Sequence, residues 1–208
     1  MKRHYCVAIT GASGVIYGVR LIRELLAAGN RLSILISSSG FTVLKEEMGL
    51  DWAGYEELSN KLLHTHFNVA PDRLAFYSED NFFSPLASGS AAPDAMIVAP
   101  CSMGSLARIA AGLSGTLLER AADVMLKEGK PLLLLPRETP LSAIHLENML
   151  KLSRLGVRII PAMPGFYGHP QTVDDIVNFV VGKVLDQLGI EGNLFRRWGE
   201  LLPDSGEN

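Results

Sequence analysis

The fold is decided most directly by one stretch of the chain, Leu132-Leu133-Leu134-Leu135-Pro136-Arg137-Glu138-Thr139-Pro140. Its four leucines are typical of a strand buried on both faces of a parallel sheet. We therefore predict that a buried strand places Arg137 and Glu138 at its carboxyl end, where ligands bind in open α/β sheets. A fixed guanidinium beside a fixed carboxylate favours phosphate binding coupled to proton transfer. The alternative is a salt-bridged pair in a surface loop.

Other apolar segments are expected to join this strand in a parallel sheet, since helical patterns alternate with them. These segments are residues 5–9, 31–36, 95–99 and 157–160. Residues 74–77 are a further short strand candidate, within a less regular region, residues 49–83, that we interpret as an insertion over the sheet. The pattern predicts an α/β fold, namely a three-layer doubly wound parallel sheet of Rossmann-like type.

Length and composition favour one domain and exclude several classes of protein. The chain has 208 residues, of which 48% are hydrophobic, and no linker divides it, so we predict a single domain over 1–208 with a C-terminal arm from about 190. A net charge of -3 and scattered basic residues disfavour nucleic-acid binding. The apolar run at residues 5–9 is too short for a signal peptide, and no stretch reaches transmembrane length. Two cysteines make no disulfide framework, so we expect a cytoplasmic protein.

The first expected strand leads into a glycine-rich turn, Thr10-Gly11-Ala12-Ser13-Gly14. Backbone amides at such a helix start hold a phosphate or a ring edge, and glycine permits the close approach. Two absences argue against a nicotinamide enzyme. The second strand ends in three serines (37–39) instead of the acidic residue that would bind a ribose, and no tyrosine is followed four positions later by lysine. A mononucleotide held by hydroxyl groups is the better interpretation.

A second candidate phosphate site follows the expected strand at residues 95–99. It comprises Ser102, Met103, Gly104 and Ser105, which offer two hydroxyls and several amides at a helix start. Ordinary capping of the helix by Ser102 is the alternative. We expect this segment to converge with Gly11, Ser37 and Arg137 at one edge of the sheet.

Several ordered blocks of the sequence carry a resemblance to a known family. They are 10–14, 100–103, 118–127, 136–140 and the segment Pro161-Ala162-Met163-Pro164-Gly165-Phe166-Tyr167. Over nearly its whole length the chain resembles the UbiX flavin prenyltransferase family of the flavoprotein (cysteine decarboxylase-like) superfamily. The resemblance implies that dimethylallyl phosphate alkylates reduced FMN at N5 and C6. The product, prenylated FMN, would serve a UbiD-type decarboxylase, for example in ubiquinone biosynthesis, and the enzyme would be a homo-oligomer, by resemblance a dodecamer.

The resemblance also implies roles for individual residues. FMN would be held by Gly11, Ala12, Ser13, Ser37, Ser102, Met103, Gly104, Ser105 and Arg137. The prenyl phosphate would be held by Arg120, from an adjacent subunit, and by Lys127, Arg137, Tyr167 and Lys183. Proton-handling roles fall to Ser13, Glu47 and Glu138.

General chemistry is compatible with these roles. Fixed cations stabilise a departing phosphate without a metal, so we expect no metal. Burial and neighbouring cations would perturb Glu138 so that it protonates this phosphate. An aromatic wall from Trp198 or Tyr167 would stabilise an allyl cation, although Trp198 is also explained as an anchor of the tail. Lys183, where relatives carry arginine, would keep the charge but lose bidentate geometry, and it is equally explained as a surface lysine.

The sequence is compatible with two other functions. One is an FMN-dependent decarboxylase of the same superfamily, although Pro164 stands where those proteins have asparagine. The other is a non-catalytic FMN carrier, which would not need Glu138, Tyr167 or Lys183. The sequence does not decide between the monophosphate and the diphosphate of the dimethylallyl group, because both satisfy the same cations.

Overall fold

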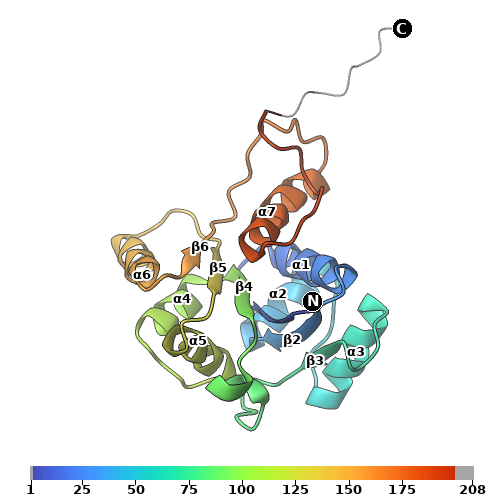
Figure 1. The fold of residues 1–208 in the computed structure, drawn as a ribbon, viewed down its shortest axis with the longest axis vertical. Helices are drawn as coiled ribbons and strands as arrows, with labels where there is room; N and C mark the ends of the chain where they lie inside the picture. The colour runs from blue at the N-terminus through green and yellow to red at the C-terminus, as the bar shows by residue number, and fades with distance from the viewer. Residues whose placement is uncertain (1, 200–208) are drawn as a thin grey trace, which may run out of the picture. The chain divides into compact units, whose positions relative to one another are not determined.

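A computed structural model describes residues 2–199. Its six strands form one parallel sheet in the order β3-β2-β1-β4-β5-β6 (Figure 1). The strands are β1 (His4–Ile9), β2 (Arg31–Ile36), β3 (Leu74–Phe76), β4 (Ala95–Cys101), β5 (Leu132–Pro136) and β6 (Arg158–Ile159). This order confirms the predicted doubly wound sheet, whose direction of winding reverses between β1 and β4.

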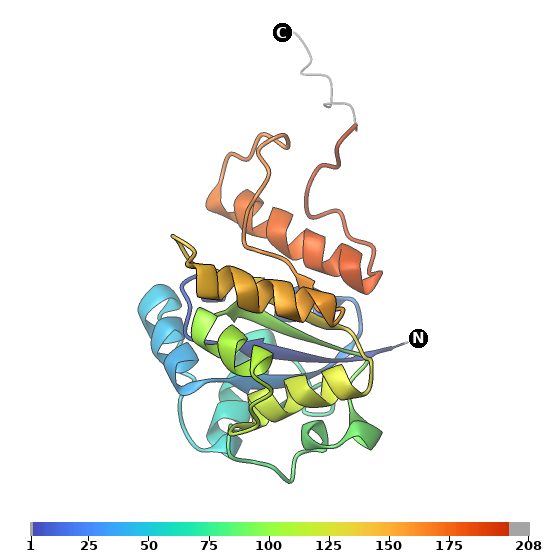
Figure 2. The same ribbon diagram turned by 90° about the vertical axis from the view of Figure 1, so that its left-hand side faces the viewer.

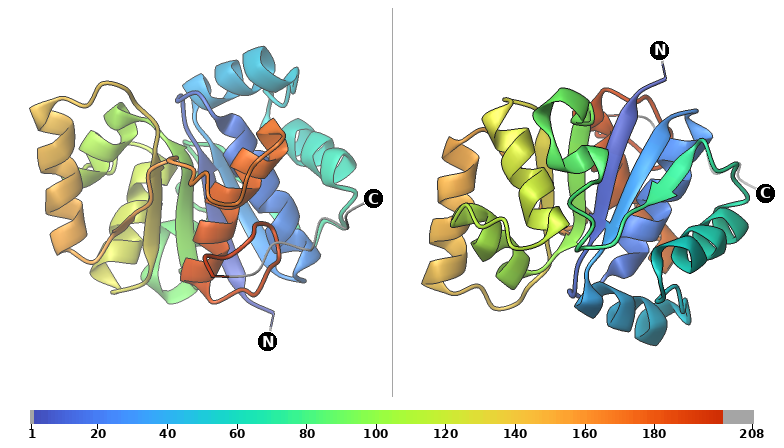
Figure 3. Two further views of the ribbon diagram at one scale, coloured as in Figure 1. Left: turned by 90° about the horizontal axis from the view of Figure 1, so that it is seen from above. Right: turned by 90° about the horizontal axis from the view of Figure 1, so that it is seen from below.

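Helices cover both faces of the sheet (Figures 2 and 3). The first half contributes α1 (Val15–Ala27), α2 (Ser38–Met48) and α3 (Glu56–Phe67). The second half contributes α4 (Met103–Ala110), α5 (Leu117–Lys127) and α6 (Ala143–Arg154), preceded by two short 3-10 helices, η1 (Pro85–Ala87) and η2 (Gly89–Ala91). Within the described part, none of the helices is long and apolar enough to cross a membrane.

The chain divides into two compact units, residues 1–162 and residues 163 onward. The first contains the whole sheet and helices α1 to α6, and the second contains α7 (Val173–Leu188). The single domain over 1–208 with an arm from about 190 stays a prediction, and residues 200–208 lie outside the described part.

One glycine fixes how closely α1 packs on the sheet. A Cβ atom added at Gly18 would lie 2.2 Å from the backbone oxygen of Ala99 in β4 and 3.0 Å from a side-chain carbon of Ile9 in β1. The missing side chain thus lets the helix backbone approach the two strands that flank the reversal point. This close packing holds the start of α1 at the carboxyl edge of the sheet.

The interpretation of residues 49–83 as an insertion over the sheet is wrong. These residues contain α3 and β3, and β3 pairs with β2 as the edge strand of the sheet. The segment is therefore a regular crossover between neighbouring strands. The strand candidate at residues 74–77 is confirmed as β3, but its three residues are too few to show from the sequence that it joins the sheet.

A half-buried histidine makes stability depend on pH. His4 is half-buried at the start of β1, and its Nε2 lies 2.8 Å from Ser33 Oγ. Burial, reinforced by the charge of Arg31, lowers the pKa of His4 from 6.5 to about 4. Between these values the unfolded chain binds a proton that the folded chain does not, so acidification favours unfolding. Stability conferred by neutral His4 is complete above pH 6.5 and declines towards pH 4.

We expect His4→Gln to lose less stability than the wild type between about pH 7 and about pH 5, because glutamine does not titrate. Urea unfolding of both proteins at the two pH values measures this difference. Carboxyl groups titrate in both proteins, so only the difference between them is informative. Equal losses in the two proteins would contradict the prediction.

Candidate active site

The candidate site begins where the sheet reverses its winding, at the carboxyl ends of β1 and β4. Thr10 follows β1, and its Oγ1 donates a hydrogen bond to Pro100 O at 2.8 Å and accepts one from Ser102 N at 2.8 Å. Its backbone amide also donates to Pro100 O at 3.3 Å. One buried hydroxyl therefore ties the two loops that flank the reversal point, which is where ligands bind in folds of this kind.

The glycine-rich turn after β1 lies beside both α2 and Arg137. Arg137 Nε donates to Ser13 O at 3.1 Å, which fixes the guanidinium against the turn. A Cβ atom at Gly11 would lie 2.3 Å from Ser39 Oγ, so the turn and the start of α2 are in close contact. Gly14 adopts φ 98°, a conformation that favours glycine. The structure thus brings together three segments that the sequence predicted to converge.

The amides at the start of α1 are already bonded to a carboxylate. Glu47, near the end of α2, accepts hydrogen bonds from Gly14 N at 2.9 Å and 3.2 Å and from Val15 N at 3.2 Å. A carboxylate is stabilised there by the positive end of the helix dipole. The negative charge of Glu47 would repel a phosphate group at the same amides. Of the two ligands considered for this turn, a ring edge is therefore favoured over a phosphate.

The start of α2 is organised by serine and by a second carboxylate. Ser37 caps the helix by accepting a hydrogen bond from Gly40 N at 3.0 Å, and its Oγ lies 3.2 Å from Ser39 Oγ. Glu79 accepts from Ser38 N at 3.0 Å. The starts of α1 and α2 are thus each paired with a carboxylate at the carboxyl edge of the sheet.

The start of α4 is capped by a neutral hydroxyl group instead. Ser102 Oγ accepts from Ser105 N at 3.2 Å and donates to Ser105 Oγ at 3.1 Å, so the capping interpretation of Ser102 is correct. Capping does not remove the site, because a hydroxyl cap adds no negative charge to the positive end of the helix dipole. A Cβ atom at Gly104 would have only Arg108 Nη1 nearby, at 3.8 Å. Among these three helix starts, α4 is the one best suited to an anion.

Glu138 lies directly after β5, as predicted, but its environment differs from the expected one. Its Oε1 accepts a hydrogen bond from Thr139 N at 3.0 Å, and the residue is exposed. The burial that we expected for this carboxyl group is therefore not provided by the single chain. The reason is that Glu138 follows the buried strand and stands on a loop at the edge of the sheet.

Arg120 and Lys127 on α5 are not brought to the other predicted residues within one chain. Arg120 donates to Ala87 O at 3.1 Å and pairs with Asp123 at 2.7 Å. Lys127 pairs with Glu128 at the end of α5, close to where the chain enters β5. Strands begin at the amino edge of the sheet, so Lys127 lies at the edge opposite to Arg137.

In the second unit the structure brings three predicted residues into one aromatic cluster. The ring of Tyr167 lies 5.3 Å from that of Trp198 and 5.7 Å from that of Phe179. Lys183 Nζ lies 5.6 Å from the centre of the Phe179 ring and 5.1 Å from that of Phe195. These distances are those of cation-π contacts. The cluster therefore combines an aromatic surface with a cation, as the prediction for Tyr167, Lys183 and Trp198 requires.

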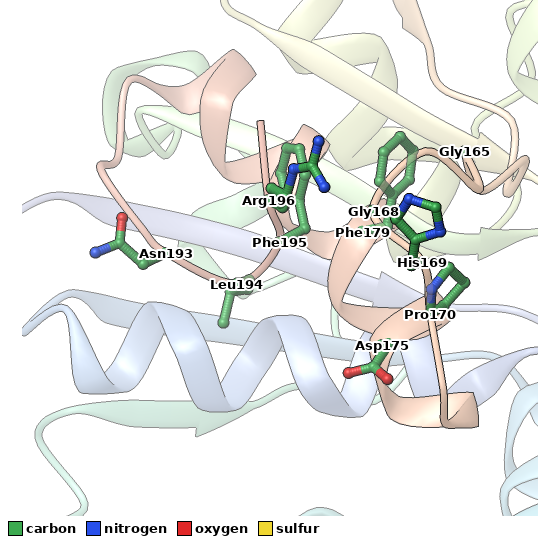
Figure 4. Close-up of a pocket in the computed structure, with 10 residues that line it drawn as sticks. All are labelled: Gly165, Gly168, His169, Pro170, Asp175, Phe179, Asn193, Leu194, Phe195 and Arg196. Carbon is green, nitrogen blue, oxygen red and sulfur yellow. The ribbon is translucent and has the colours of Figure 1, made fainter. Parts of the chain in front are cut away.

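A cavity of about 290 Å³ lies next to this cluster, between the loop before α7 and the segment after it (Figure 4). Its lining residues are Gly165, Gly168, His169, Pro170, Asp175, Phe179, Asn193, Leu194, Phe195 and Arg196. Phe179 and Phe195 belong both to the cavity and to the aromatic cluster. Of the residues predicted to form the site, none lines the cavity.

Comparisons with known proteins give the family. A family model described as Flavoprotein matches residues 1–185. A protein of Halalkalibacterium halodurans named flavin prenyltransferase UbiX is 52% identical over 199 residues, which cover 96% of this chain and 95% of that protein. The chain belongs to the UbiX family of flavin prenyltransferases. The resemblance seen in the sequence is thereby confirmed.

Solved structures of UbiX-like proteins share the fold. AnUbiX, in complex with FMN and dimethylallyl pyrophosphate, is 33% identical with a TM-score of 0.84, covering 97% of this chain and 100% of that chain. A dodecameric FMN-dependent UbiX-like decarboxylase from Escherichia coli O157:H7 is 42% identical with a TM-score of 0.81, covering 95% and 100%. The doubly wound flavoprotein fold is therefore common to this chain and its UbiX relatives.

Two residues of this candidate site were missed by the sequence analysis. Thr10 was quoted only as part of the turn, although its hydroxyl joins the two central loops. Glu79 was missed because it lies 41 residues from its partner Ser38, in the region misread as an insertion. A threonine ending a buried strand is a usable signal for the first. No sequence pattern identifies the second.

Proposed function

We propose that this protein transfers the dimethylallyl group of dimethylallyl phosphate to N5 and C6 of reduced FMN, which gives prenylated FMN. The observation that carries the proposal is the 52% identity to a flavin prenyltransferase over nearly the whole chain. The AnUbiX complex, which contains both FMN and dimethylallyl pyrophosphate, supports the same pair of ligands. We further propose that the product is passed to a UbiD-type decarboxylase in the cytoplasm.

The residues at the sheet edge fit FMN. The neutral cap of α4 and the open space beside Gly104 suit the phosphate group, whereas the glycine-rich turn and the Ser37 hydroxyl suit uncharged parts of the flavin. We propose that FMN is held by Gly11, Ala12, Ser13, Ser37, Ser102, Met103, Gly104, Ser105 and Arg137. FMN supplies the nucleophilic nitrogen and carbon atoms to which the prenyl group is joined.

The chemistry asks the protein chiefly to stabilise charge. Cleavage of the allylic carbon-oxygen bond builds negative charge on the departing phosphate, and fixed cations stabilise that charge. Arg137 is suited to this role because its Nε is bonded to Ser13 O, which holds the guanidinium at the edge of the sheet. We propose that Glu138 protonates the phosphate and that Ser13 relays the proton lost from flavin N5, with Glu47 assisting in proton handling.

The remaining substrate contacts would come from other parts of the assembly. We propose that Arg120 binds the prenyl phosphate from an adjacent subunit of a homo-oligomer. We propose the same for Lys127, which lies at the edge of the sheet opposite to Arg137. The dodecameric UbiX-like relative supports a twelve-subunit assembly. Tyr167, Lys183 and Trp198 would supply the aromatic surface and a further cation. Burial of Glu138 would then result from assembly.

The test is anaerobic incubation of the purified protein with reduced FMN and dimethylallyl phosphate, followed by mass spectrometry of the extracted flavin. We expect a flavin heavier by one C5 unit. A parallel incubation with the diphosphate decides which substrate is preferred. Recovery of unmodified FMN from protein that binds it would overturn the proposal and favour a decarboxylase or a flavin carrier.

A further inference from the structure

The loop between β3 and η1 is held in a defined conformation by α3. Glu56, in the first turn of α3, accepts hydrogen bonds from Ser78 N at 2.8 Å and from Ser78 Oγ at 3.1 Å. The same carboxylate accepts from Asn81 Nδ2 at 3.0 Å and 3.2 Å. Hydrogen bonds to an ionised group are stronger than neutral ones. Glu79, which lies between Ser78 and Asn81, is therefore presented from a braced loop.

From this loop Glu79 reaches the starts of two helices. Its carboxylate oxygen Oε2 accepts from Ser38 N at 3.0 Å and from Ser38 Oγ at 3.3 Å, at the first turn of α2. Its backbone oxygen accepts from Leu117 N at 2.7 Å, the first residue of α5. One residue thus links the helix that begins next to Ser37 to the helix that carries Arg120.

We propose that Glu79 is a positioning residue for flavin binding that acts through Ser37, an inference that rests on the proposed function. The carboxylate fixes the peptide unit between Ser37 and Ser38, because it bonds directly to the Ser38 amide. Ser37 Oγ accepts from Gly40 N and lies 3.2 Å from Ser39 Oγ. When Ser39 is the donor in that contact, the Ser37 proton is left for an acceptor on the ligand. Occupation of the Ser38 amide by Glu79 leaves the Ser37 hydroxyl as the group offered to the flavin.

The first measurement is the dissociation constant of FMN, from quenching of its fluorescence by the full-length protein. We expect Glu79→Ala to weaken binding about tenfold, because the acceptor of the Ser38 amide is lost. Glu79→Gln keeps an acceptor oxygen and should stay within about twofold of the wild type. The matched control is Glu57→Ala, which removes an exposed carboxylate on α3 outside this loop. Glu79→Asp, too short to reach Ser38, replaces the alanine variant if that variant does not fold.

A double-mutant cycle with Ser37→Ala separates positioning from general destabilisation. If Glu79 acts through Ser37, then Glu79→Ala should change FMN affinity less than about twofold once the Ser37 hydroxyl is gone. Independent, multiplying effects of the two substitutions would overturn the proposal, and so would unchanged affinity in Glu79→Ala. If the wild type itself fails to bind FMN, the proposed function fails instead. The two failures are thus distinguishable.

Discussion

Replacement of Arg137 by alanine is expected to lower kcat/KM for prenyl transfer by about 10³-fold. The guanidinium is held against the glycine-rich turn by its bond to Ser13 O and lies at the reversal point of the sheet. Removal of a fixed cation from a departing phosphate costs most in the transition state, where the charge is largest. The rate constant should therefore fall more than the affinity for the prenyl phosphate.

Steady-state formation of prenylated flavin by the wild type and Arg137→Ala measures this effect. Arg137→Lys should recover part of the activity, because a lysine keeps the charge without the planar fork of donors. Arg154→Ala, at the exposed end of α6, is the control for loss of a positive charge and should match the wild type. A loss of activity in Arg137→Ala no greater than in the control would show that this arginine does not serve the reaction.

Gly18→Ala is expected to have the largest effect on stability. Alanine is favoured over glycine within a helix by about 1 kcal/mol. The new Cβ, however, would lie 2.2 Å from the backbone oxygen of Ala99, which cannot move aside as a flexible side chain can. Overpacking costs roughly 1–3 kcal/mol and occasionally more, and a contact this short with a backbone atom falls at the upper end of that range. The clash therefore outweighs the gain in helix propensity, and α1 must shift away from β4.

Urea or thermal unfolding of the two proteins measures the loss, and FMN binding should weaken with it because α1 begins at the glycine-rich turn. Gly168→Ala is the matched control, since a Cβ atom there would meet nothing within 4 Å. A Gly18→Ala protein as stable as the wild type would mean that α1 does not pack against β4 as closely as described here.

Much of the fold was predictable from local pattern. The buried run of leucines in β5 and the apolar segments of β1, β2 and β4 identified the central strands, because strands buried on both faces must be continuously apolar. The short strand candidate at residues 74–77 is confirmed as β3, although its apolar run is shorter. Its three residues are too few to show a period, and its place in the sheet is decided by pairing with β2.

The candidate site, too, was predictable from the sequence in part. Pattern alone predicted that several strand ends, with Gly11, Ser37, Ser102 and Arg137, would meet, because the carboxyl ends of parallel strands share one edge. The pairing of helix starts with carboxylates is visible only in the folded chain, since Glu47 and Glu79 lie far along the sequence from Gly14 and Ser38. Hydrogen bonds depend on distance and direction in space, and neither is encoded in the spacing of residues along the chain.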